Sequence, residues 1–255
     1  MQSETSQQHH KVVEQFSKQA IPFAQLPGHY DSIQLLMEMG QLHANDTVLD
    51  VACGPGLIVC ACAKVARHAT GIDITPTMLE EARKKQGQLG LSNITWDLGD
   101  VEALPYPDNS FSVVMTRYSL HHFLQPEKVV AEMYRVCQPG GRIVVADVAL
   151  PADKVAAYDE MEKLRDDSHT SALSFEAFES LFASMCLQHV RRTSYKVPME
   201  LEAQLAASFP KEGDADKLRK LFRQDLDQNR LGVEVVETNG QLHFAYPISI
   251  YAGVK

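Results

Sequence analysis

Short apolar runs rich in β-branched residues alternate with amphipathic stretches through the middle of the chain. The apolar runs lie at residues 47–52, 69–74, 94–98, 112–117 and 142–148. Apolar residues at helical spacing follow at 57–67, 78–88 and 127–136. Strands joined by helices favour right-handed crossovers and parallel pairing, with helices on both faces of the sheet. The pattern therefore predicts an α/β fold built on a doubly wound, mostly parallel sheet.

Both ends of the chain depart from this alternation. Apolar residues at helical spacing from Val12 to Phe23 predict an N-terminal helix that breaks near Pro22 and Pro27. A second helix is expected over residues 30–39.

Beyond Pro151 the pattern predicts helices over 154–165 and 175–185, a strand over 187–197 and a polar helix over 200–230. Two further runs, 233–237 and 242–254, flank the turn Asn239-Gly240 and predict a closing hairpin. Without the short run 233–237, the sheet would then have seven strands, the last of them antiparallel.

The charge balance argues against nucleic acid as a partner. The 255 residues have a formal net charge of -9 and a pI of about 5.6, which would repel a phosphate backbone. A small-molecule substrate is the more natural expectation. The protein itself is expected to be a monomer or a homodimer.

Cysteine usage and hydropathy favour a cytoplasmic protein. The five cysteines are an odd number without a CxxC pair, which is typical of a reduced protein without a metal site. No stretch approaches the ~18 apolar residues of a membrane span, and the polar N-terminus lacks a signal-peptide core. We interpret His9 and His10 as part of a mobile polar tail.

The first predicted strand ends in a glycine turn, Asp50-Val51-Ala52-Cys53-Gly54-Pro55-Gly56. Ligands of doubly wound sheets bind at such strand ends, and the glycines let the backbone approach a ligand closely. A single GxG is compatible with a dinucleotide, a phosphate or no ligand. Val59 stands where a dinucleotide site needs a small residue, and no Gly-Lys-Ser/Thr follows, which argues against a P-loop.

Two acidic residues follow the next predicted strands. Asp73 ends the second strand, where a carboxylate accepts hydrogen bonds from both hydroxyls of a ribose; capping of the following helix is the alternative. Asp100 follows the third strand in Gly99-Asp100-Val101-Glu102. Three strand-end signals together predict a nucleoside site without a phosphate requirement.

Residues 47–148 resemble the class I S-adenosylmethionine-dependent methyltransferases, in the broad group that includes the ubiquinone and menaquinone C-methyltransferases. The matching stretches are VLDVACGPG, GIDITPTML, GDVEALPYPDNSF and EMYRVCQPGGRIVVAD. The resemblance implies S-adenosylmethionine as cofactor, S-adenosylhomocysteine as product, and methylation of O, N, C or S on a small molecule.

The same resemblance implies the cofactor-binding residues. Ala52 to Gly56 would hold the methionine moiety and Asp73 the ribose, while Asp100 would bind the adenine amine. The full implied set is Asp50, Ala52, Cys53, Gly54, Gly56, Asp73, Ile74, Met78, Asp100, Val101, Glu102 and Arg117.

It also implies an organisation in three parts within a single structural domain. Residues 1–40 would form a mobile helical lid and 41–150 the cofactor-binding core. Residues 151–255 would complete the sheet and add a helical cap over 200–231.

His121 and His122, directly after the fourth predicted strand, are the candidate catalytic bases, because a histidine poised near neutral pH can deprotonate an acceptor. Capping of the strand end is the alternative. The quinone C-methyltransferases typically have Arg-Asn here, so His-His argues against a quinone acceptor.

Further candidates lie in the C-terminal part. Asp167 and His169 are possible substrate contacts. Four apolar side chains are candidates for lining a substrate cavity, with core packing as the alternative: Tyr195, Met199, Phe209 and Phe222.

Two other functions stay open. One is a methyltransferase fold that binds the cofactor without methyl transfer, as a sensor, a partner protein or a catalyst of another reaction. The other is a nicotinamide-dependent oxidoreductase.

Overall fold

The structure, a computed structural model, describes residues 3–25 and 31–255. The helices are α1 (Glu4–Gln25), α2 (Asp31–Met39), α3 (Leu57–Ala63), α4 (Pro76–Leu89), α5 (Pro126–Val136), α6 (Ala152–Arg165), α7 (Phe175–Ser184), α8 (Leu201–Ser208) and α9 (Asp214–Asp225), with a 3-10 turn η2 (Leu120–His122). The strands are β1 (Thr47–Val51), β2 (His68–Asp73), β3 (Ile94–Leu98), β4 (Phe111–Arg117), β5 (Cys137–Leu150), β6 (Leu173–Ser174), β7 (Gln188–Glu200), β8 (Val236–Thr238) and β9 (Gln241–Val254).

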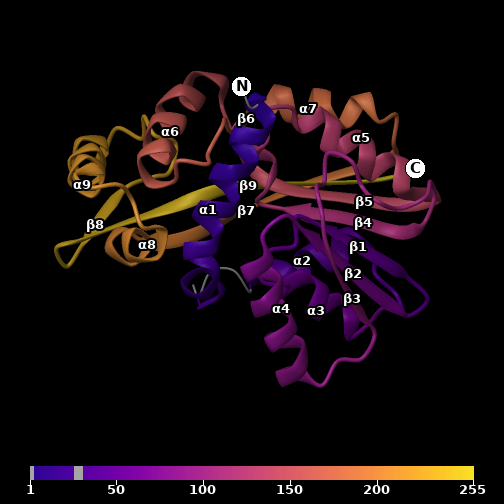
Figure 1. Ribbon diagram of the computed structural model, residues 1–255. Coiled ribbons are helices and arrows are strands. Elements are labelled where there is room, and N and C mark those ends of the chain that lie inside the picture. Colours follow the sequence, from indigo (N-terminus) through magenta and orange to yellow (C-terminus); the bar gives the residue numbers. More distant parts are fainter. Residues whose placement is uncertain (1–2, 26–30) are drawn as a thin grey trace.

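The strands form one mixed sheet in the order β3-β2-β1-β4-β5-β9-β7 (Figure 1). The first five in this row pair in parallel, whereas β9 pairs antiparallel with both β5 and β7. Two short strands lie off the row, β6 on β5 and β8 on β9. The predicted doubly wound α/β fold with an antiparallel last strand is confirmed.

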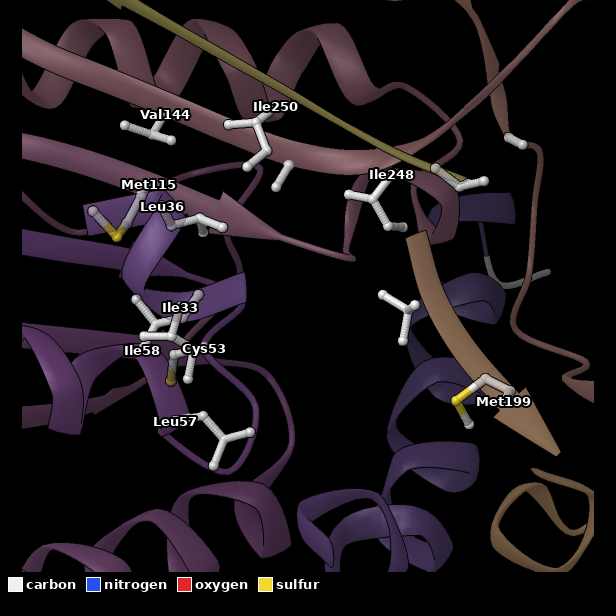
Figure 2. Packing of buried hydrophobic residues seen from close by; sticks show 14 of the residues in the cluster. Ile33, Leu36, Cys53, Leu57, Ile58, Met115, Val144, Met199, Ile248 and Ile250 are labelled. Carbon is white, nitrogen blue, oxygen red and sulfur yellow. The ribbon is translucent and has the colours of Figure 1, made fainter. Parts of the chain in front are cut away.

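Helices cover both faces of this sheet, which is why its central strands are apolar along their whole length. Every residue of β4 except Arg117 is buried. One cluster of buried side chains joins Ile33 of α2 with Met115 of β4, Val144 of β5 and Ile250 of β9 (Figure 2). A second cluster packs α5 and α7 against the other face.

The chain reverses direction across the sheet at β1. From β1 it proceeds through β2 to β3 on one side, and it returns to place β4 and β5 on the other. The loops that leave the carboxyl ends of β1 and β4 therefore diverge, and a crevice opens between these loops. Helix α1 crosses this edge and packs on α4 and α8 (Figure 1).

The interpretation of His9 and His10 as a mobile tail is wrong, because both lie in α1. The helix also continues through Pro22 to Gln25, while Pro27 lies outside the described residues. Three glutamines of α1 are buried, and each donates a side-chain N–H to a backbone carbonyl: Gln8, Gln15 and Gln19. Across the described ranges, no helix is long and apolar enough to cross a membrane.

The segment 200–231 also differs from its prediction as a single helix. It consists of α8 and α9, separated where Phe209 adopts a left-handed backbone with a φ of 55° immediately before Pro210. A proline cannot continue the hydrogen-bonding of α8, so the chain turns there.

Gly56→Ala is expected to destabilise the fold by about 2–4 kcal/mol, because backbone strain and overpacking add. Gly56 has a φ of +74°, and a Cβ there would lie 2.4 Å from the ring of Trp96. Gly90 is the matched control, since its φ is +65° but no atom lies within 4 Å of an added Cβ. Gly90→Ala should lower the free energy of unfolding, measured in urea, by about 1 kcal/mol. Equal losses in the two variants would contradict the packing argument.

Candidate functional site

A cavity of about 940 Å³ lies at the carboxyl ends of β1, β2 and β4, beneath α1. Ten of the twelve residues implied by the sequence line it: Asp50, Ala52, Cys53, Gly54, Asp73, Ile74, Met78, Asp100, Val101 and Arg117. Gly56 and Glu102 do not: Gly56 packs on Trp96, and Glu102 lies beside His9. His9, Val12 and Phe16 of α1 also line this first cavity.

The glycine turn is tied to the second strand by Asp73. The backbone N–H groups of Gly54 and Thr75 each donate to its carboxylate at 2.8 Å. Burial raises the pKa of Asp73, and these two hydrogen bonds oppose that shift by stabilising the charged form. Ala52, Gly54 and Gly56 all have a positive φ, so the turn needs this fixed partner. The remaining lone pairs of the Asp73 carboxylate stay available to a ligand in the cavity.

Asp50 is the most unusual group in the cavity. Asp50 is 1% exposed, and neither of its carboxyl oxygens has a hydrogen-bond partner. Burial raises the pKa of Asp50 to about 8, with the positive charge of Arg117 opposing the shift. A buried carboxyl without a donor is costly, so this position is suited to a ligand that supplies a donor or a positive charge.

His9, Asp100 and Glu102 meet at the rim of the first cavity. His9 Nε2 lies 3.4 Å from Glu102 Oε2 and 3.9 Å from Asp100 Oδ1, which joins α1 to the loop after β3. Over the described part of the chain, this is the one trio of metal-ligating side chains whose ligand atoms lie within 4.8 Å of one another. All three are partly exposed, and acidic groups at a surface commonly gather without a cation.

The end of β4 is held rigidly. Arg117 Nη1 donates to Ser32 Oγ at 2.8 Å, and its guanidinium lies 4.7 Å from the centre of the Tyr118 ring. Tyr118 has a φ of 58°, a strained conformation for an aromatic residue, and its hydroxyl is 2.5 Å from that of Tyr195. Such strain persists where surrounding contacts hold a side chain in one place.

A second cavity of about 630 Å³ adjoins the first, and Phe16, Tyr118 and His122 line both. Its other walls come from α1, η2, β5, α6, β7, α8 and β9: Gln19, His121, Asp147, Val148, Tyr158, Glu162, Arg165, Asp166, Val197, Met199, Gln204, Tyr246 and Ile248. Most of these residues are far apart in the sequence. Of the four apolar side chains that the sequence suggested for a substrate cavity, only Met199 lines this one.

His121 forms a buried pair with Asp147, a residue that the sequence reasoning missed. His121 Nδ1 lies 2.5 Å from Asp147 Oδ1, and the N–H groups of Leu120 and Val148 also donate to this carboxylate. Burial favours the neutral imidazole, but Asp147 outweighs it and raises the pKa of His121. With Nδ1 engaged, Nε2 is the nitrogen available to the second cavity. The available signal was an acidic residue at the end of the strand 142–148.

His122 has the opposite environment. Its ring packs edge-on against Phe16 at 4.9 Å, and its Nδ1 lies 3.1 Å from Ser168 Oγ. Burial, reinforced by the neighbouring His121, lowers the pKa of His122 to about 3. The His122 ring is therefore neutral at physiological pH, and the two adjacent histidines differ in partner and in the direction of their pKa shifts.

The remaining candidates lie elsewhere. Asp167 is half-exposed and pairs with Lys211 at 2.9 Å. His169 is buried and lies 2.7 Å from Asp159, outside both cavities. Phe209 is exposed, and Phe222 packs in the core against Phe244.

Residues 49–145 match a family model described as a methyltransferase domain. YcgJ of Bacillus subtilis, an uncharacterized methyltransferase, is 28% identical over 175 residues, which are 68% of this chain and 69% of that protein. The uncharacterized protein YafE of Escherichia coli is 31% identical over 149 residues, 58% of this chain and 72% of that protein.

The ubiquinone/menaquinone biosynthesis C-methyltransferase UbiE of Desulfotalea psychrophila is 36% identical over 148 residues. These cover 52% of this chain and 59% of that enzyme. The crystal structure of YcgJ superimposes with a TM-score of 0.82 at 24% identity, over 89% of this chain and 99% of that one. This likeness extends the match in fold beyond residues 49–145.

Proposed function

Because this chain belongs to the methyltransferase family that its residues 49–145 match, we propose that it methylates a small, partly apolar molecule with S-adenosylmethionine. The first cavity would hold the cofactor and the second the acceptor. The observation that carries the proposal is their common wall of Phe16, Tyr118 and His122, since a methyl group must pass directly between the two ligands.

The polar groups of the first cavity fit the cofactor. The unpartnered carboxyl of Asp50 suits the ammonium of the methionine moiety, and Arg117 suits its carboxylate. Asp73 would accept the ribose hydroxyls and Asp100 the adenine amine, with Ile74 and Val101 against the adenine faces and Met78 beside them. The cofactor would supply a methyl group bound to a sulfonium, whose sulfur leaves as a neutral thioether when a nucleophile attacks the methyl carbon in line.

The residues of the second cavity supply the proton chemistry. His121 Nε2 would accept and hold the proton that the acceptor atom loses when it is methylated. Asp147 holds His121 in position and stabilises the imidazolium that forms. His122 stays neutral and, with Phe16 and Tyr118, excludes water from the passage.

Helix α1 would act as the lid. It closes both cavities through Phe16, and the Gln8 side chain donates to the carbonyls of His122 and Ser168. Its glutamine contacts are few and polar, so opening costs less than unpacking an apolar helix face. Ligands would enter when it moves.

Calorimetry with S-adenosylhomocysteine and a screen of acceptors with radiolabelled S-adenosylmethionine test this function. We expect micromolar binding of the product and labelled methyl transfer to a hydroxyl-, thiol-, amine- or acidic-carbon compound. Product binding with no labelled acceptor across the panel would favour a cofactor-binding protein without methyl transfer. A thermal shift with NADH and none with S-adenosylhomocysteine would favour an oxidoreductase.

Binding of S-adenosylhomocysteine at pH 7 is expected to release about one proton, because Asp50 is mostly protonated in the free protein and the ligand's ammonium favours its carboxylate. Affinity should therefore rise as the pH rises from 6 towards about 8. Calorimetry in buffers of different ionisation enthalpy measures the release. Asp50→Asn should abolish it; an unchanged release would place the titrating group elsewhere.

A further inference from the structure

One end of the second cavity has an unusual hydrogen-bonding pattern. Glu162, Arg165, Gln204 and Tyr246 line both this cavity and a smaller cavity beneath α8 and α9. Gln204 is 6% exposed, and its side-chain oxygen Oε1 has no hydrogen-bond partner. A buried amide oxygen without a donor is uncommon in a folded protein, and here it lines the cavity proposed for the acceptor.

The neighbours of Gln204 determine which end of its amide faces Ser208. The single hydroxyl proton of Ser208 is donated to the backbone carbonyl of Gln204 at 2.7 Å. Ser208 Oγ can then only accept, and Gln204 Nε2 lies 3.4 Å from it. The amide nitrogen is thereby directed to Ser208, and the oxygen is left for the cavity.

Glu162 provides a second acceptor at this end. Its Oε2 accepts two hydrogen bonds from Arg165, whereas its Oε1 receives only the hydroxyl of Tyr246 at 3.1 Å. Asp166 adds a further carboxylate, so two acidic groups face one guanidinium. His121 is paired with Asp147, which leaves no uncompensated positive charge among the residues that line this cavity. A ligand anion would be repelled here.

We propose that the acceptor carries, apart from the atom that is methylated, a hydrogen-bond donor that binds Gln204 Oε1 and Glu162 Oε1. The donor is a neutral hydroxyl or a cationic amine, and acceptors with a carboxylate or phosphate at this position are rejected. The inference rests on the proposed function, because it assigns the second cavity to the acceptor. Discrimination of this kind is strong when a site would otherwise leave a buried acceptor unpaired.

Four phenols with the same ring and different tails test the proposal. The tail of para-ethylphenol has no donor, that of tyrosol has a hydroxyl, that of tyramine an ammonium, and that of para-hydroxyphenylacetate a carboxylate. Each is titrated against the protein with and without saturating S-adenosylhomocysteine. Tyrosol and tyramine should bind at least about tenfold more tightly than para-ethylphenol, and para-hydroxyphenylacetate should bind most weakly.

Gln204→Leu should reduce the advantage of tyrosol over para-ethylphenol to less than about threefold, since the acceptor oxygen is gone. Gln204→Glu should instead increase the preference for tyramine over tyrosol. Gln15→Leu is the matched control, because Gln15 also donates to Ser208 but lines neither cavity. It should retain the order of the four phenols, and urea unfolding checks that all variants fold.

Three results would overturn the inference. The first is tightest binding by para-hydroxyphenylacetate, and the second is an undiminished tyrosol preference in Gln204→Leu. The third is that neither tyrosol nor tyramine binds more tightly than para-ethylphenol, which includes the case that none of the phenols binds. Failure to bind S-adenosylhomocysteine would instead count against the proposed function. Because product binding and phenol binding are measured separately, the two failures are distinguishable.

Discussion

Asp73→Ala is expected to weaken the binding of S-adenosylhomocysteine at least about 100-fold while the protein remains folded. The carboxylate would accept two ribose hydroxyls, and hydrogen bonds to a charged group contribute about 1.5–3 kcal/mol each. It also accepts the N–H groups of Gly54 and Thr75, so its removal loosens the turn that would hold the methionine moiety. Calorimetry measures the affinity, and circular dichroism with urea unfolding verifies the fold.

Asp73→Asn separates the two contributions. An asparagine oxygen can still accept one of the backbone hydrogen bonds, but the charge is lost and the amide nitrogen cannot accept the second. Its affinity should lie between those of the wild type and Asp73→Ala. An affinity in Asp73→Ala equal to that of the wild type would show that the ribose binds elsewhere.

His121→Ala is expected to lower the turnover rate by about 100- to 10,000-fold, the range typical of a lost general base. The affinity for S-adenosylhomocysteine should change little, because His121 lines the second cavity and not the first. Rates are measured on the acceptor that the radiolabel screen returns. His122→Phe, which keeps a ring without a titratable nitrogen, should lose far less. Equal losses in both variants would contradict the assignment of the base to His121.

Asp147→Asn tests whether Asp147 acts through His121. His121 must be neutral to take a proton, and Asp147 raises its pKa above the ordinary value near 6.5. The rate should therefore rise with pH through that raised pKa. Removing the negative charge disfavours the imidazolium and lowers the pKa, so the rising limb of the pH profile should move to lower pH as kcat falls. A purely structural role would lower activity without moving the limb.

Much of the fold and of the first cavity was predictable from local patterns. The buried strands are continuous apolar runs because helices cover both faces of the sheet, and the carboxyl ends of β1, β2 and β4 must then meet at one edge. Asp50 lies next to the last residue of β1, Asp73 ends β2 and Asp100 follows β3, so their grouping around one cavity follows from topology. Glu102 also follows β3, but its side chain lies beside His9 and does not line the cavity.

The second cavity was not predictable in this way. Its polar residues come from elements as distant as α1, η2, β5, α6, α8 and β9. No local pattern distinguishes Gln204 or Glu162 from solvated helix positions. The early start of the N-terminal helix, through His9 and His10, was missed for a similar reason: the glutamines of this helix are polar in the sequence, yet they are buried because backbone carbonyls of distant segments accept their N–H groups.

The amino-acid sequence by itself determined the alternation of strands and helices, the glycine turn and the acidic residues at the strand ends, because these depend on backbone preferences and burial over a few residues. Only the tertiary structure decided how His121 and His122 differ. They are neighbours in the chain, but Asp147, 26 residues from His121, lies against one ring, while Phe16 and Ser168 enclose the other. The charge of a buried group depends on its burial and on partners that the fold brings from elsewhere in the chain.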